Sequence, residues 1–153
     1  DMDVTPIVLN DRVYWANYQG AVGSYDLNTG ASVWQKAASV YAGIASDKNT
    51  LYVTEAQQSL KSYDLTTGEL RWEQKGFDRD NMLTAPVVYG DFLLVADSQG
   101  YLHALNKLTG LPVGSSKIAY QSGYLAPPLI DGKHVVMFAD DGALTAIDLK
   151  MKK

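Results

Sequence analysis

Hydrophobic and polar positions along the chain alternate in short runs separated by turn-forming residues. In the first repeat, PIVLN, VYWAN, AVGSYD and ASVWQK are rich in Val, Ile, Tyr and Trp, and they are divided by Asn-Asp, Gln-Gly and Asn-Thr-Gly. Such short alternating runs bounded by Gly, Asn or Asp are typical of β-strands joined by tight turns. The glycines of these turns, Gly20 among them, are expected to supply the positive φ that a tight hairpin demands. No stretch shows sustained apolar spacing of 3.6 residues, so the pattern predicts an all-β fold with almost no helix.

The same pattern recurs four times along the chain. The phrase YDLNTGASVW at residues 25–34 returns as YDLTTGELRW at residues 63–72, and its Asp anchors the comparison. The equivalent anchors, separated by 38, 42 and 42 residues, are Asp26, Asp64, Asn106 and Asp148. Thirteen positions before each anchor stand the apolar residues Val13, Leu51, Leu93 and Val135. Repeats of this length are typical of propellers and solenoids.

Four short strands in each repeat, which we call A to D in chain order, predict a β-propeller, whose blades are four-stranded antiparallel sheets packed face to face. We expect one partial propeller over residues 1–153, with blades at approximately 4–38, 40–76, 84–119 and 125–150. The last repeat stops at Asp148-Leu149 without a fourth strand for its blade. An unpaired sheet edge invites aggregation, so we expect the chain to be part of a larger propeller.

The repeated phrase also predicts how neighbouring strands C and D are joined. The anchor side chain is expected to accept hydrogen bonds from turn amides, and the Gly four residues later is expected to supply a positive φ. The Trp eight residues after the anchor is expected to cover the seam between blades, where full burial contributes about 2–3 kcal/mol. The third repeat has Gly114 at that position. The residues assigned to this structural repeat are Asp26, Gly30, Trp34, Asp64, Gly68, Trp72, Asn106, Gly110 and Asp148.

Composition narrows the possible functions. The 153 residues carry a net charge of -4, and no basic run exceeds Lys150–Lys153, which argues against a nucleic-acid binder and suits a basic protein partner. There is no cysteine, which excludes disulfides and thiolate chemistry within this sequence. No apolar run approaches the ~20 residues of a membrane-spanning helix. The opening residues DMDVTPIVLN do not form a signal peptide, so any targeting signal is expected upstream.

Longer stretches carry a resemblance to known families. The pattern S/A-x-D-x-x-T-G-x-x-x-W resembles the repeat of quinoprotein-type propellers, which include PQQ-dependent dehydrogenases and non-catalytic scaffolds. Three segments are similar to the C-terminal half of the BamB family: DMDVTPIVLNDRVYWA, MLTAPVVYGDFLLVADSQGYLHAL and PLIDGKHVVMFADDGALTAI. The most specific stretch is Asp97–His103.

This resemblance implies an eight-bladed, non-catalytic lipoprotein without a cofactor, at the periplasmic face of the Gram-negative outer membrane. Its expected role is that of a scaffold in the β-barrel assembly (BAM) complex. The implied partners are the POTRA domains of BamA, with nascent outer-membrane proteins as a further class and no nucleic acid. Membrane contact is expected only through a lipid anchor on an N-terminal part outside this sequence.

The resemblance also points to partner-binding residues. The family's acidic partner-contacting pair matches the pattern D-x-D-x-T-P at Asp1 and Asp3. Strands alternate in direction within a blade, so this segment before strand A is expected on the same rim as the D-to-A loop at residues 77–80. Clustered carboxylates there would steer a basic surface, with each exposed pair contributing ~0.2–1 kcal/mol. The predicted partner-binding residues are Asp1, Asp3, Asp78, Arg79 and Asp80. A merely solvated polar loop remains the alternative for Asp78 and Asp80.

Other kinds of site find less support. His103 and His134 are far apart and have no further ligands at metal-binding spacing, and the Asp-containing segments 97–100 and 140–142 fall in predicted hairpin turns. No metal site is therefore predicted. The dehydrogenases use a vicinal cysteine pair that this sequence does not contain, and no nucleophile trio stands at a recognised spacing. A dehydrogenase fragment and another extracytoplasmic propeller, binding a protein or a surface polymer, remain as alternatives.

Overall fold

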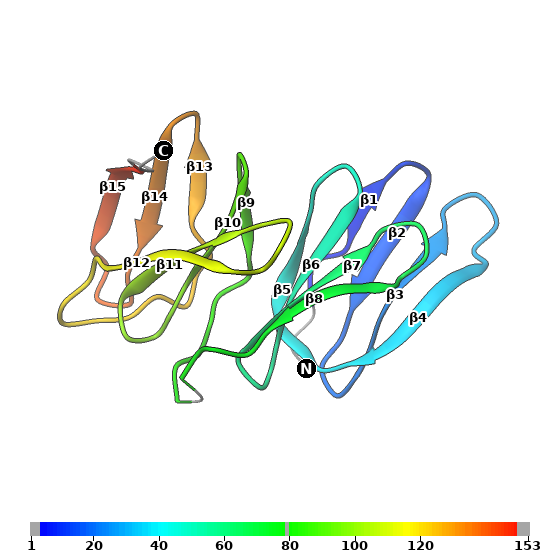
Figure 1. Cartoon of the computed structure of the whole chain (residues 1–153), viewed down its shortest axis with the longest axis horizontal. Coiled ribbons are helices and arrows are strands. Elements are labelled where there is room, and N and C mark those ends of the chain that lie inside the picture. Colours follow the sequence, from blue (N-terminus) through cyan, green and yellow to red (C-terminus); the bar gives the residue numbers. More distant parts are fainter. Residues whose placement is uncertain (1–3, 79, 150–153) are drawn as a thin grey trace. The chain divides into compact units, whose positions relative to one another are not determined.

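The computed structural model describes residues 4–78 and 80–149. Within these residues every regular element is a β-strand, arranged in four antiparallel sheets, and no helix is present that could cross a membrane. The predicted all-β fold of repeated antiparallel sheets is confirmed (Figure 1). The chain divides into two compact units, Asp1–Arg79 and Asp80–Lys153, which we call unit 1 and unit 2.

Unit 1 contains two four-stranded sheets, drawn from blue to green in Figure 1. The first has the order β1 (Ile7–Leu9), β2 (Arg12–Ala16), β3 (Gly20–Asp26) and β4 (Ser32–Ala38). The second has the order β5 (Val40–Ser46), β6 (Thr50–Glu55), β7 (Ser59–Asp64) and β8 (Leu70–Gln74). Each strand pairs with its neighbour in sequence, so every connection inside a sheet is a hairpin.

Unit 2 repeats this plan with one four-stranded and one three-stranded sheet. The first consists of β9 (Val87–Tyr89), β10 (Phe92–Ala96), β11 (Tyr101–Asn106) and β12 (Pro112–Lys117). The second consists of β13 (Leu129–Asp131), β14 (His134–Phe138) and β15 (Leu144–Asp148). Asp148 ends β15, where its carboxylate lies 2.6 Å from His134 Nδ1 and 3.4 Å from Lys133 Nζ.

The C-to-D turns have the chemistry that the repeat predicts. Asp26 Oδ1 accepts hydrogen bonds from the amides of Asn28 and Thr29 at 3.0 and 2.8 Å, and Asp64 and Asn106 make the same two contacts in their turns. The glycine four residues after each anchor has a φ of 70–71°, a conformation that costs glycine little. These glycines are Gly30, Gly68 and Gly110.

One turn differs from the prediction that glycine supplies the positive φ. In the turn between β2 and β3, Gln19 has the positive φ of 52°, and Gly20 already opens β3. A Cβ at Gly20 would overlap the side chain of Asn17, whose Oδ1 accepts a hydrogen bond from the Ala21 amide at 2.7 Å. A Cβ at Gly20 would therefore displace the Asn17 side chain and disturb this hydrogen bond. In the next sheet Gln58 takes the left-handed conformation, with a φ of 57°.

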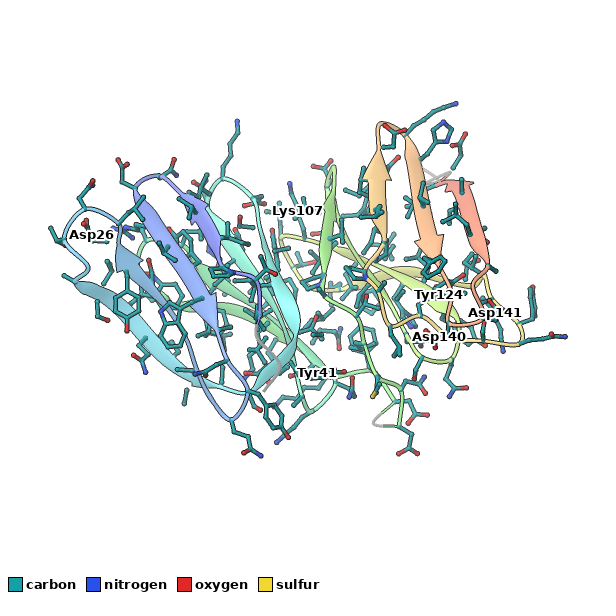
Figure 2. The ribbon with its side chains drawn as sticks, turned by 180° about the vertical axis from the view of Figure 1, so that it is seen from behind. Asp26, Tyr41, Lys107, Tyr124, Asp140 and Asp141 are labelled. Atoms are coloured by element: carbon teal, nitrogen blue, oxygen red, sulfur yellow. The ribbon has the colours of Figure 1, made fainter. Side chains whose placement is uncertain are left out.

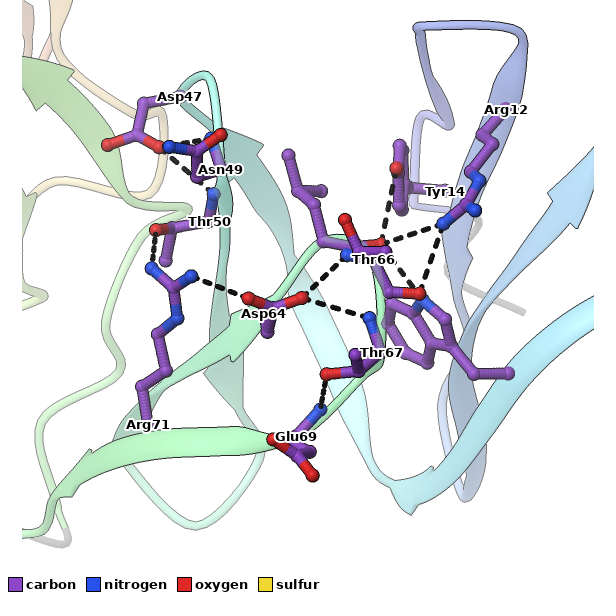
Figure 3. Close-up of polar contacts among 12 residues, drawn as sticks. Arg12, Tyr14, Asp47, Asn49, Thr50, Asp64, Thr66, Thr67, Glu69 and Arg71 are labelled. Atoms are coloured by element: carbon purple, nitrogen blue, oxygen red, sulfur yellow. Dashed lines mark hydrogen bonds and ion pairs between the residues drawn. The ribbon is translucent and has the colours of Figure 1, made fainter.

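The seam between the two sheets of unit 1 is built around Trp34. Its indole is 8% exposed and lies 6.4 Å from the ring of Tyr63, centroid to centroid. Trp34 Nε1 donates to the Leu65 carbonyl at 3.0 Å, and the Tyr14 hydroxyl donates to the same oxygen at 3.3 Å (Figure 3). The predicted role of this Trp at a seam is therefore seen here. Trp72, at the equivalent position of the second repeat, is half-buried, with its ring 6.1 Å from that of Tyr52.

Each seam joins two different kinds of sheet face. We call the face that packs on the next sheet of the chain the forward face, and the face that packs on the preceding sheet the backward face. In unit 1 the forward face of the first sheet contributes Tyr14, Ala16, Val22 and Trp34, and the backward face of the second contributes Leu51, Val53, Tyr63 and Leu65. In unit 2 the forward face contributes Leu94, Ala96, Leu102 and Ala104, and the backward face contributes Val135, Met137, Ile147 and Leu149. Both seams use the same backward-face offsets from the anchor: 13 and 11 residues before it, and one residue on either side.

Candidate partner-binding rim

A single residue, Ser39, connects the two sheets of unit 1 between β4 and β5. Its hydroxyl accepts a hydrogen bond from the Gln19 amide at 3.1 Å, and its carbonyl accepts one from the Ala56 amide at 2.8 Å. The next residue, Val40, donates its amide to the Asn17 carbonyl at 3.0 Å. These bonds tie the B-to-C turns of both sheets to the connection between them. The rim of unit 1 that carries these loops is therefore ordered before any partner binds.

Unit 2 uses the same arrangement, with Gly123 and Tyr124 in place of Ser39 and Val40. The Tyr124 amide donates to the Asp97 carbonyl at 2.9 Å, and the Asp140 amide donates to the Gly123 carbonyl at 3.0 Å. Figure 2 shows Tyr124 near the turn that contains Asp140 and Asp141. Tyr124 is 1% exposed, and burial together with the charge of Asp141 raises the pKa of its hydroxyl. Each unit thus holds its rim loops together through backbone hydrogen bonds.

A groove of about 670 Å³ opens on this rim of unit 1. Its walls come from the end of β4, the turn between β6 and β7, and strands β7 and β8. Small residues of β4 and the turn form part of the lining. The charged and aromatic side chains of the lining are Glu55, Lys61, Glu73, Lys75 and Phe77.

The charged side chains of the groove neutralise one another. Lys61 Nζ lies 2.7 Å from Glu55 Oε2 and 3.6 Å from Glu73 Oε1, and Lys75 Nζ lies 3.2 Å from Glu73 Oε2. Burial alone would lower the pKa of the Lys61 ammonium, but its hydrogen bond to Glu55 and the two carboxylate charges outweigh burial and raise that pKa. The groove therefore presents ordered polar groups whose charges are balanced.

The Glu55–Lys61 pair has an equivalent in unit 2. The acid stands nine positions before the repeat anchor and the base three before it, and in the third repeat these positions hold Asp97 and His103. His103 Nε2 lies 2.9 Å from Asp97 Oδ2, and Asp97 Oδ1 accepts two hydrogen bonds from amides of its own turn. Burial alone would raise the pKa of Asp97, but the hydrogen bonds from His103 and the turn amides lower it. An acid–base pair thus brackets the B-to-C turn in both units, with the acid before the turn and the base after it.

Two of the five predicted partner-binding residues fall within the described part of the chain. Asp78 is exposed and directly follows Phe77, whose half-buried ring lines the groove of unit 1. Asp80 is exposed at the start of unit 2, where the next residue, Asn81, donates from Nδ2 to Asp97 Oδ2 at 3.3 Å. The predicted gathering of carboxylates stays a prediction. The other three residues lie outside the described part: Asp1, Asp3 and Arg79.

The groove charges were missed from the sequence, although two signals point to them. Glu55 and Lys61 stand at the repeat offsets that hold Asp97 and His103 in unit 2, and comparing these offsets reveals the pair. Glu73 is the direct cross-strand partner of Lys61 in the β7–β8 hairpin, and opposite charges at such positions attract. Repeat offsets and cross-strand pairing therefore point to more of the groove residues than the acidic loop segments do.

This rim has the chemistry of a recognition surface. It combines ion pairs, backbone groups held in fixed positions, an aromatic ring and the exposed carboxylate of Asp78. Across residues 4–78 and 80–149, no group of three or more Asp, Glu or His side chains is placed to hold a metal ion. The groups present can orient a peptide or a protein surface through hydrogen bonds and charge.

Known proteins match this chain along nearly its whole length. The family model of outer membrane protein assembly factor BamB matches residues 1–74, 16–113 and 56–151. BamB of Legionella pneumophila is 36% identical over 149 residues, which is 97% of this chain and 38% of that protein. BamB of Pseudomonas aeruginosa is 30% identical over 150 residues, 98% of this chain and 39% of that protein. The crystal structure of BamB from Moraxella catarrhalis has a TM-score of 0.87 at 22% identity, covering 97% of this chain and 44% of that chain.

The same fold occurs in enzymes. Quinohemoprotein alcohol dehydrogenase from Comamonas testosteroni has a TM-score of 0.78 at 16% identity, covering 97% of this chain and 33% of that chain. Likeness at this identity shows a shared propeller fold alone. The chain spans about two fifths of the length of the curated relatives it matches. The overlapping family matches over the repeats show that this chain belongs to the BamB family of outer membrane protein assembly factors.

Proposed function

We propose that this chain serves as a non-catalytic scaffold in outer-membrane protein assembly and binds the POTRA domains of BamA at the periplasmic face of the outer membrane. The names of its relatives support the assembly role. The observation that carries the binding proposal is the ordered rim of unit 1, where the Ser39 hydrogen bonds fix loops around the groove and Asp78 lies exposed beside Phe77. A rim that is already ordered loses little conformational entropy on binding.

Each group on this rim has a distinct part in the proposed contact. The Asp78 carboxylate attracts a basic surface and raises the rate of encounter. Phe77 supplies an apolar contact, and the paired charges of the groove exchange hydrogen bonds with the partner. Asp1, Asp3, Arg79 and Asp80 belong to the same proposed surface by the family pattern and the rim argument. Nascent outer-membrane proteins are a second proposed partner class, and a lipid anchor outside this sequence would supply membrane attachment.

Calorimetric titration with the periplasmic POTRA region of BamA tests this proposal. The parent chain, an Asp78→Lys variant, an Asp1→Lys/Asp3→Lys variant and an Asp91→Lys control are titrated at low and at physiological salt. Asp91 is exposed in the A-to-B turn between β9 and β10, so the control makes the same charge change on the other kind of turn. We expect both rim variants to weaken binding by roughly tenfold, the control to bind like the parent, and salt to weaken binding by the parent.

Two results would contradict the proposal. Equal loss in the rim variants and in Asp91→Lys would show that overall charge, and not this rim, governs binding. No binding by the parent, with binding by the full-length Legionella relative under the same conditions, would place the interface outside this sequence. A rise in melting temperature on adding PQQ and calcium would favour the dehydrogenase alternative instead.

A further inference from the structure

Glu73 is an acid of the unit 1 groove that the fold does not require. It stands nine positions after the anchor Asp64, and the same position holds Gln35 in the first sheet and Ser115 in the third. Both neutral residues occupy the same cross-strand place in the equivalent hairpins, opposite the residue three positions before the anchor. A negative charge at this position is therefore not needed to form the hairpin.

The buried lysine of the groove does not depend on Glu73 either. Lys61 Nζ lies 2.7 Å from Glu55 Oε2 but 3.6 Å from Glu73 Oε1, which is longer than a hydrogen bond. In unit 2 the equivalent base, His103, pairs with Asp97 at the position of Glu55, and the position of Glu73 is a serine. The groove of unit 1 thus contains one acid more than this acid–base pair uses.

The other neighbour of Glu73 is easily displaced. Lys75 Nζ lies 3.2 Å from Glu73 Oε2, but the Lys75 side chain is 73% exposed, and an ion pair made by such a lysine contributes little stability. The Glu73 side chain is only 25% exposed, so its charge acts more strongly on a cation that enters the groove and excludes water. An incoming cation therefore gains this carboxylate at the cost of one weak ion pair.

The groove suits a flat cation. Its volume of about 670 Å³ lies in the range of sites that bind small ligands, and the ring of Phe77 lines it together with small residues. A guanidinium group donates two parallel hydrogen bonds to a carboxylate, packs its planar face on an aromatic ring and is more weakly hydrated than an ammonium group. A carboxylate and an aromatic ring in one groove therefore favour arginine over lysine.

We propose that the groove of unit 1 binds one arginine side chain of a protein partner, which pairs with Glu73 and displaces Lys75. The Glu55–Lys61 pair stays in place and keeps the wall of the groove ordered. This inference rests on the proposed function in taking a basic protein surface as the partner. It adds which side chain of that surface enters the groove and which carboxylate receives it.

NMR titration of the chain with N-acetyl-arginine methylamide, at constant ionic strength, tests the groove without a partner protein. We expect a Kd of roughly 1–10 mM, with the largest chemical-shift changes at the amides of the groove residues. N-acetyl-lysine methylamide is expected to bind roughly fivefold more weakly, because an ammonium group lacks the paired hydrogen bonds and loses more hydration.

Four variants assign the binding to the two side chains. Glu73→Gln is expected to weaken arginine binding by at least roughly tenfold. Glu69→Gln is its control, because Glu69 is exposed directly before β8 and the substitution makes the same charge change in the same hairpin. Lys75→Ala should tighten binding roughly two- to threefold by removing the competing ammonium group. Lys48→Ala, in the exposed turn between β5 and β6, should bind like the parent.

Three results would overturn the proposal: no chemical-shift change at the groove, equal binding by the parent and Glu73→Gln, or tighter binding of the lysine probe. Circular dichroism and urea midpoints check that all variants fold. Titration of the same variants with the POTRA region of BamA separates this proposal from the proposed function. POTRA binding that Asp78→Lys weakens and Glu73→Gln leaves unchanged would support the rim contact and overturn the arginine site. Binding of the arginine probe without POTRA binding would support the arginine site and count against BamA as the partner.

Discussion

Replacing Gly68 with alanine probes the seam of unit 1 with a built-in control. Gly68 and Gly30 hold the same position in their turns, with φ values of +70° and +71°. A Cβ at Gly68 would lie 2.5 Å from Trp34 Cδ2, whereas a Cβ at Gly30 would have nothing within 4 Å. The two substitutions therefore share the backbone strain of a left-handed alanine and differ in the contact with the Trp34 ring.

The structure sets the size of this difference. A left-handed alanine costs about 1–2 kcal/mol, which is the whole loss of stability expected for Gly30→Ala. An extra methyl in a packed contact adds about 1–3 kcal/mol. Trp34 cannot move aside without weakening its hydrogen bond to the Leu65 carbonyl, so relieving the clash costs stability. Gly68→Ala is therefore expected to lower the free energy of unfolding by about 2–5 kcal/mol.

Urea unfolding followed by circular dichroism and tryptophan fluorescence measures both losses, provided that the slope with urea is unchanged. The comparison is then repeated in a Trp34→Val background, which removes the ring. There, Gly68→Ala should cost no more than Gly30→Ala. Equal losses for the two alanines in the parent background, or a gap that persists without Trp34, would refute the reasoning.

Two further substitutions test the charges of unit 1. Lys61→Met leaves the Glu55 carboxylate, whose side chain is 11% exposed, without its main ionic partner, and urea midpoints should show that the free energy of unfolding falls by about 1–3 kcal/mol. Lys75→Met is the control, because this lysine side chain is 73% exposed and its loss should cost at most about 0.5 kcal/mol. Equal losses for the two variants would contradict this ranking. The Thr67 amide and the Arg71 side chain lower the pKa of Asp64 from 3.8 to about 2, so its contribution to stability is present above about pH 4 and is lost as the pH falls towards 2. Asparagine does not titrate in this range, and Asn106 shows that its side chain can accept the same turn hydrogen bonds. Asp64→Asn should therefore flatten the fall of the urea midpoint between pH 4 and pH 2. An unchanged slope would contradict this assignment.

The repeat made strands and seams predictable because the same offsets from the anchor place a residue on the same strand and the same face of each sheet. The predicted seam role of Trp34 followed from its fixed distance to Asp26, which places it on the forward face. The expectation for Gly20 was wrong because the positive φ of this turn falls one residue earlier, at Gln19, whereas Gly20 already belongs to β3 and packs against the Asn17 side chain. Positive φ at Gln19 could not be read from residue type, since glutamine shows no strong preference for it.

The candidate site was less predictable than the fold. The Lys61–Glu73 contact depends on the register of one hairpin and on the reach of two long side chains, which are known only once the sheet is seen in three dimensions. Exposed carboxylates such as Asp78 and Asp80 carry no periodic signal, because an acidic loop that binds a partner and one that is only solvated have the same composition. Their assignment rests on the family pattern and on the rim argument.

The Ser39 connection gives unit 1 a mechanical property. One residue spans only about 3.5 Å, so there is no slack between β4 of the first sheet and β5 of the second. The hydrogen bonds to Gln19 and Ala56 join the neighbouring turns to the same point. A force applied to one loop of this rim would be transmitted directly to both sheets. A partner domain that swings while bound there would turn both sheets of unit 1 with it instead of stretching a tether.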